Sequence, residues 1–205
     1  MYVAGNNNNA VWEYDLSTAW NISSASFLQT FNVAAQETNI QAVFFKPDGL
    51  KMYIAGHTGD TVVEYDLSTA WDISTAVFLQ SFSLAPYGNS PQGLSFKVDG
   101  TKMYFAQLSG TNEGVVEYNL STAWDVSTAS YSKNFVTTAN VTSPTGLFFN
   151  PDGTGFYVTD YSSDRLYQYN LGGFSVSAQD TVPNSVFFKP EGDKMYILGR
   201  TGDKV

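Results

Sequence analysis

The hydrophobic and polar positions of this chain follow a pattern that returns about every fifty residues. An apolar run leads into a Pro-Asp-Gly turn, and a second apolar run follows it, as in Phe45 to Gly56. Similar copies begin at Phe96, Phe149 and Phe188. In such a turn, Pro presets φ, Gly supplies unusual backbone angles and Asp bonds the local backbone. The pattern therefore predicts two strands joined by a tight turn in each copy.

Each complete copy contains two more predicted strands. In the first copy, strand a lies near Ala42, strand b at 51–55, strand c at 61–67 and strand d at 78–84. Strand b is apolar on both faces, which indicates a sheet that is covered on both sides. A single four-stranded unit cannot bury both faces, so it must stack on its neighbours, as the blades of a β-propeller do. A β-sandwich is the alternative, which the regular repeat disfavours.

The predicted fold is all-β: a small β-propeller, one domain over 1–205, with four blades of four antiparallel strands. The blades are expected at about 40–85, 91–137 and 144–178, with a composite blade from 184–205 plus 1–35. The N-terminal and C-terminal strands would share that last blade and close the ring. Strand b occurs five times, so one copy is spare. Either one terminal copy is displaced, or two chains pool their blades into a ring of about eight.

Composition limits the classes of partner. Hydrophobic residues make up 43% of the chain and charged residues 14%, which argues against disorder. A net charge of −9 would repel phosphate backbones, so no nucleic-acid partner is expected. No apolar run approaches 18 residues, so no membrane insertion is expected. With no Cys and a single His, a Cys/His zinc site is excluded, and we predict no cofactor.

Three tryptophans occupy equivalent connections between strands c and d: Trp20, Trp71 and Trp124. Ser-Thr precedes each Trp, and Asp72 and Asp125 follow the second and third, a pattern that predicts a capped short helical turn. An indole beside Asp, Asn or Ser side chains is also typical of a sugar-stacking site, and three copies would bind multivalently. The alternative is that each Trp covers the rim of its own blade or of the next one.

The loops between strands b and c are polar and vary between copies. In a propeller they share a face with the d–a loops, so they are either a recognition face or unconstrained loops. The candidate ligand-binding residues here are His57, Asp60, Asp160 and Asp164. The three Asp residues could meet a cation, although no acidic spacing matches a calcium loop, and we predict no metal site. His57 has no identifiable triad partner, so no catalytic residue is predicted.

The repeated motif resembles the YVTN and NHL-like group of β-propeller repeats. The residues that carry the resemblance are Pro47 to Gly49, Met52 to Ile54 and Val63 to Leu67, together with their copies. The resemblance implies a propeller fold, which serves surface proteins, scaffolds, lectin-like modules and some lactonases. The Ser-Thr-Ala-Trp insertion departs from the usual short connection. The near-identical copies resemble those of large repetitive surface or viral proteins, which favours an extracellular or virion-surface location.

We therefore expect a non-enzymatic binding or recognition scaffold for glycans or proteins. One alternative is an architectural repeat that self-associates through the spare strand b. The other is a metal-dependent, lactonase-like hydrolase with an axial site. The second alternative needs acidic and Asn or His ligands in the axial funnel. Strand a and its approach offer mostly uncharged residues, namely Asn39, Gln41, Asn89, Gln92, Thr145 and Asn184.

Overall fold

The computed structural model of the chain describes residues 1–108, 114–137, 141–150, 154–170, 183–188 and 195–199. The chain divides into two compact units, Met1–Leu171 and Gly172–Val205. The strand d predicted near Phe174 and the start of a strand c predicted at 203–205 lie outside the described residues.

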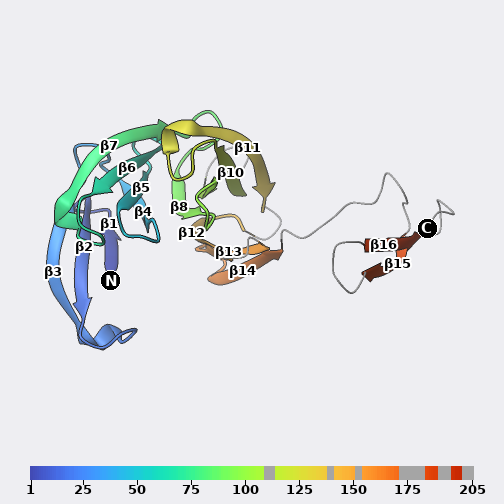
Figure 1. Ribbon diagram of the computed structural model, residues 1–205, viewed down its shortest axis with the longest axis horizontal. Helices are drawn as coiled ribbons and strands as arrows, with labels where there is room; N and C mark the ends of the chain where they lie inside the picture. The colour runs from blue at the N-terminus through green and yellow to red at the C-terminus, as the bar shows by residue number, and fades with distance from the viewer. Residues whose placement is uncertain (109–113, 138–140, 151–153, 171–182, 189–194, 200–205) are drawn as a thin grey trace. The chain divides into compact units, whose positions relative to one another are not determined.

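Antiparallel sheets follow one another along the first unit (Figure 1). The first sheet is β1 (Tyr2–Gly5), β2 (Ala10–Leu16) and β3 (Ala25–Asn32). The second is β4 (Ile40–Phe45), β5 (Lys51–Gly56), β6 (Thr61–Leu67) and β7 (Ala76–Ser83). The third is β8 (Pro91–Phe96), β9 (Lys102–Gln107), β10 (Gly114–Leu120) and β11 (Ala129–Val136). The fourth is β12 (Pro144–Phe149), β13 (Gly155–Asp160) and β14 (Arg165–Asn170). The second unit holds the hairpin of β15 (Pro183–Phe188) and β16 (Met195–Gly199).

The two predicted turns that lie within the described residues, at Gly49 and Gly100, form as the sequence predicts. The N–H of Gly49 donates to the carbonyl of Lys46 at 2.8 Å, and the Asp48 carboxylate accepts from the N–H of Leu50 at 3.0 Å. Gly49 has φ +75° and its counterpart Gly100 has φ +73°, a region that side chains with a Cβ rarely adopt. The turn therefore requires glycine at this position.

The hydrophobic core lies between the sheets rather than within any one of them. One buried cluster joins the first and second sheets, another joins the second and third, and another joins the third and fourth. The inner strand β8 packs against β4 on one side and β12 on the other, and β1 packs on β4. The second and third sheets are thus covered on both faces by different neighbours. That is the arrangement of propeller blades, and it is not a two-layer sandwich.

The sequence leaves open which terminal copy of strand b is spare, and the strand pairing shows where each copy lies. The N-terminal copy of strand b, β1, pairs with β2 of its own sheet, with Tyr2 opposite Glu13. The copies of strands a and b at the other end, β15 and β16, form a two-stranded sheet by themselves. Among the described residues no strand pairing closes a ring. The composite blade and the predicted blade bounds stay predictions.

We expect Gly100→Ala to destabilise the fold because it combines two costs. The substituted residue would have to hold φ +73°, and its Cβ would lie 2.3 Å from Nε1 of the Trp124 indole. Together these should lower the free energy of unfolding by about 2–3 kcal/mol, measured by urea denaturation.

The control for this prediction is the same change in a Trp124→Ala background. There the clash is gone, and Gly100→Ala should cost only about 1 kcal/mol for the backbone. An equal cost in the two backgrounds would show that the indole does not restrict this position.

Candidate functional site

Each Trp-bearing connection ends in a short, capped helical turn, as the sequence predicts. The turns are η1 (Ile22–Ser24), η2 (Ile73–Thr75) and η3 (Val126–Thr128). The capping residues are Asn21, Asp72 and Asp125, and each side chain accepts a 3.0 Å hydrogen bond from the N–H two positions later. The Trp before each cap has a positive φ of 65–68°, which is unusual for a bulky residue. Surrounding contacts must therefore hold these loops.

At Trp124, contacts with the neighbouring sheet add to the hydrogen bonds within the loop. The side chain of Trp124 is 9% exposed and is enclosed by aromatic rings of its own sheet and of the preceding sheet. Phe96 of its own sheet lies 5.5 Å away between ring centroids, and Phe44 of the preceding sheet lies 6.3 Å away. The Tyr53 hydroxyl, also from the preceding sheet, donates to the Trp124 carbonyl at 2.7 Å. The indole therefore joins two neighbouring blades.

A buried polar cluster lies beside this aromatic contact. Glu64 of the second sheet is fully buried, and its carboxylate accepts from the Lys51 ammonium at 2.5 Å and from the Gln80 amide at 2.9 Å. It also accepts from the N–H of Val126 in the third sheet at 3.1 Å. The Gln80 amide donates in addition to the capping carboxylate of Asp125 at 2.7 Å. A buried carboxylate is tolerable only when it is paired in this way.

The same contact recurs between the first and second sheets, but it is incomplete. The Tyr2 hydroxyl donates to the Trp71 carbonyl, and the Gln29 amide bridges Glu13 at 2.8 Å and Asp72 at 2.7 Å. The first sheet has no strand a, so it supplies no ring in the place that Phe44 takes over Trp124. Trp71 is accordingly 42% exposed.

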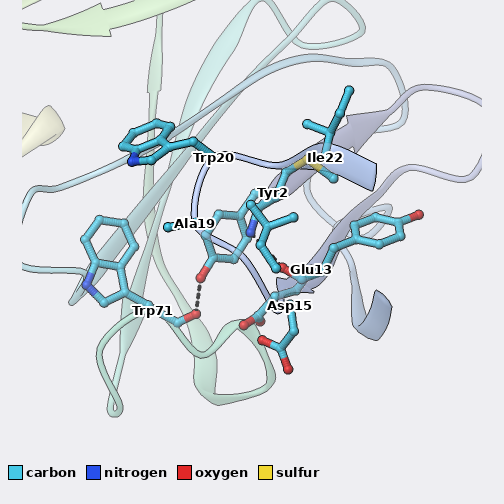
Figure 2. A pocket seen from close by; sticks show the side chains of 10 residues that line it. Tyr2, Glu13, Asp15, Ala19, Trp20, Ile22 and Trp71 are labelled. Atoms are coloured by element: carbon cyan, nitrogen blue, oxygen red, sulfur yellow. Dashed lines mark hydrogen bonds between the residues drawn. The ribbon is translucent and has the colours of Figure 1, made fainter. Parts of the chain in front are cut away.

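Trp20 is 97% exposed, because no described sheet precedes the first one. Its loop borders a hollow of about 750 Å³, which we call the open hollow. Figure 2 shows the indoles of Trp20 and Trp71 at one side of it, with Tyr2 between them and the carboxylates of Glu13 and Asp15. The residues that line it are Met1, Tyr2, Glu13, Tyr14, Asp15, Leu16, Ala19, Trp20, Ile22 and Trp71.

The open hollow is apolar with hydrogen-bonding groups at one side. Burial, followed by the nearby Glu13 carboxylate, raises the pKa of Tyr2 to about 12, so its hydroxyl remains a donor at neutral pH. Glu13 is buried and Asp15 is exposed, and ionised carboxylates act only as acceptors. The site can stack flat or apolar groups on its rings and accept hydrogen bonds from a donor that lies against them.

The predicted loop residues divide into two groups. Asp60 and Asp164 have φ of +47° and +55°, a conformation that Asp tolerates better than most residues, so each closes its turn. The Asp60 carboxylate also accepts from the N–H of Ser90 at 2.7 Å, which ties its turn to the next sheet. His57 is half exposed, and its Nδ1 lies 4.0 Å from the Asp60 carboxylate, an ion pair only when the imidazole is protonated.

Asp160 organises its loop from a buried position. Its carboxylate accepts from the N–H of Ser143 at 2.6 Å, from the hydroxyl of Ser162 at 2.8 Å and from the hydroxyl of Ser163 at 2.6 Å. Burial alone would raise its pKa, but the hydrogen bonds from Ser163 and Ser162 outweigh burial and lower the pKa to about 2. Beside the b–c loop of the second sheet this place is taken by Glu37 of the β3–β4 connection, which accepts from the N–H groups of Asn39 and Thr58.

The structure thus brings Trp20 and Trp71 to one hollow and places Trp124 in a core. The sugar-binding and cation-binding assignments of these residues stay predictions. Within the described residues, no three His, Asp or Glu side chains gather into a group that could hold a metal ion. Nor does the described part of the chain contain a helix long and apolar enough to cross a membrane.

Sequence reasoning missed Tyr2, Glu13, Asp15 and Ile22 as part of the site. A signal was present, because Tyr2, Glu13 and Ile22 align with Tyr53, Glu64 and Ile73, which are buried in the next copy of the repeat. A residue that lies in a contact between sheets in one copy borders the hollow in the copy that no described sheet precedes.

Comparison with known proteins gives a structural likeness. No protein-family model and no curated protein sequence matches the chain. A Bacteroides fragilis protein provisionally named a 6-phosphogluconolactonase aligns with a TM-score of 0.56 at 13% identity, over 93% of this chain and 48% of that one. The periplasmic gluconolactonase of Pseudomonas aeruginosa aligns at 0.50 and 16%, over 96% and 52%. The β-propeller domain of Cps50 (Swd1) from Myceliophteria thermophila aligns at 0.51 and 9%, over 80% and 48%.

At these identities the likeness shows the fold alone. It confirms an all-β arrangement of sheets that resemble propeller blades. The chain spans about half the length of these similar structures. Membership of a sequence family does not follow from them.

The most buried and the most exposed of the three loop tryptophans, Trp124 and Trp20, give a matched pair of variants. Trp124→Ala removes a buried indole and should lower the free energy of unfolding by about 3–5 kcal/mol. Trp20→Ala removes an exposed indole from the same local sequence and should change the free energy of unfolding by less than about 0.5 kcal/mol. Urea denaturation at a low protein concentration measures both. Equal costs would contradict the interfacial role of Trp124, and Trp124→Phe serves if the alanine variant does not fold.

The pKa of Asp160 predicts a pH dependence of stability. A carboxyl whose folded pKa is lowered to about 2 stabilises the fold above its ordinary pKa, and that contribution disappears as the pH falls through about 2. Asp160→Asn should therefore be less stable than wild type at pH 7, and the difference should narrow between about pH 4 and pH 2.

Asp164→Asn is the control for the Asp160 variant, because it keeps a residue that tolerates positive φ and loses no buried carboxylate. Thermal unfolding across pH 2–7 measures all three proteins. A constant difference between wild type and Asp160→Asn across this range would show that the charge of Asp160 does not stabilise the loop.

Proposed function

We propose that this chain is a non-enzymatic recognition and assembly module that uses the open hollow to bind a sheet face of a protein. The observation that carries the proposal is the exposure of one residue in three equivalent loops. Trp124 is buried by the preceding sheet, Trp71 is half covered and Trp20 is open. The hollow is the unfilled form of a contact that the chain makes elsewhere within itself.

The internal contacts indicate the chemistry of the partner. What covers Trp124 is an aromatic ring, a tyrosine hydroxyl and a carboxylate that accepts from the helical turn. A partner for Trp20 would supply the same groups: a ring against the indole, a donor to its carbonyl and an acceptor for the N–H of Ile22. A pleated sheet face offers rings and polar side chains at this spacing, since alternate residues point to one side.

Glycan binding is the second candidate. Two indoles and two carboxylates border the open hollow, and aromatic faces beside hydrogen-bonding groups suit sugar rings. The proposed function includes no lactonase activity for this chain. The gluconolactonase likeness concerns the fold, and one propeller fold serves many unrelated functions.

Ile22→Lys tests the proposed function. It places a charge in the exposed apolar border of the open hollow, far from any buried core. We expect the wild-type chain to self-associate in sedimentation velocity at micromolar concentration, and the variant to associate at least tenfold more weakly. Val98→Lys, on an exposed turn of the third sheet, is the matched control and should associate like wild type.

A glycan array with the Trp20→Ala variant separates the two candidate functions. If the proposed function is correct, the wild-type chain binds no glycan on the array. Capture of sugars by the wild-type chain that disappears in Trp20→Ala, with no self-association, would overturn protein recognition in favour of glycan binding.

A further inference from the structure

The open hollow has a counterpart at the other end of the first unit. In the second sheet, Phe44 lies opposite Tyr53, their ring centroids are 6.5 Å apart, and the two rings cover Trp124. In the fourth sheet, Phe148 lies opposite Tyr157, again with ring centroids 6.5 Å apart. The fourth sheet thus presents the aromatic pair that receives a tryptophan in the second.

Within the first unit, no other sheet covers this face of the fourth sheet, named here the end face. Phe148 is 60% exposed and Leu166 is 65% exposed. Leu166 corresponds to Val62 of the second sheet, which is fully buried against the third sheet. Large apolar side chains at such exposure on one sheet face mark an interaction surface.

The polar groups of the internal contact are also present on the end face. Gln168 lies opposite Tyr157, as Glu64 lies opposite Tyr53. Glu64 accepts the N–H of Val126 in the next sheet, and the amide oxygen of Gln168 is likewise an acceptor. The Tyr157 hydroxyl stands in the place of the one that donates to a Trp carbonyl. The end face therefore carries the ring, the donor and the acceptor that the open hollow lacks.

We propose that the open hollow of one copy of this chain binds the end face of a second copy, with Trp20 seated on Phe148 and Tyr157. The inference rests on the proposed function and names its partner. Because each copy carries one face of each kind, the contact made twice closes a pair. The chain covers 48% of a similar structure of the β-propeller type, so two copies supply about as many sheets as one such ring.

Phe148→Lys tests the partner face, and Ile22→Lys tests the hollow. Sedimentation velocity of wild type should show twice the 22.5 kDa mass of one chain, and each variant alone should remain at a single chain mass. An equimolar mixture of the two variants should restore a pair, since the intact hollow of Phe148→Lys meets the intact end face of Ile22→Lys. The restored pair has one contact instead of two and should be at least tenfold weaker than wild type.

Acrylamide quenching, read as the difference between wild type and Trp20→Phe, reports on Trp20 itself. Trp20 should become shielded as wild type associates and stay accessible in Phe148→Lys. Association that Ile22→Lys abolishes and Phe148→Lys leaves intact would overturn the end face as partner while the proposed function stands. Association indifferent to Ile22→Lys would overturn both. A shielded Trp20 in a protein of single-chain mass would show that the same chain covers the hollow, and would overturn the second copy.

Discussion

The structure depends on the burial of apolar sheet faces by neighbouring sheets. A twisted four-stranded sheet with two apolar faces, such as β4–β7, has no interior of its own, and its stability comes from the sheets on either side. The three clusters described in the first unit are all of this kind. Within the first unit, the first and fourth sheets each have one neighbouring sheet, and their other faces carry Trp20 and Phe148.

Hydrogen bonds at the tryptophan loops give neighbouring sheets a defined position relative to each other, which apolar burial alone does not. Apolar burial has no direction and would permit sheets to slide over one another. The hydroxyl of Tyr53 on the Trp124 carbonyl, and the Gln80 amide shared between Glu64 and Asp125, fix the position of one blade against the next. Trp20 has the same positive φ without these partners, so each loop holds the strained conformation by itself, and the neighbouring sheet fixes only where the loop docks.

Local features of the fold could be predicted from the sequence, whereas features set by distant neighbours could not. The glycine turns at Gly49 and Gly100, the strand order and the caps at Asp72 and Asp125 depend on a few adjacent residues, and the sequence predicts them. Trp20 and Trp124 follow the same four residues, Leu-Ser-Thr-Ala, yet one is exposed and the other buried. Only the presence of a preceding sheet distinguishes them, and no local pattern encodes it. The sequence likewise leaves open which terminal copy of strand b pairs with strand c of the first sheet, and the structure shows that β1 does.

The β-bulge between strands c and d recurs at the same register step in the first, second and third sheets, after Glu13, Glu64 and Glu117. A bulge bends its strand and fixes which side chains return to the shared face. Because these three sheets are bent at the same step, their surfaces keep one shape from copy to copy. Blades could therefore be gained or lost in whole numbers by in-frame duplication or deletion, with each new junction fitting as the old one did, whereas a loss of part of a blade would leave neither neighbour a matching surface.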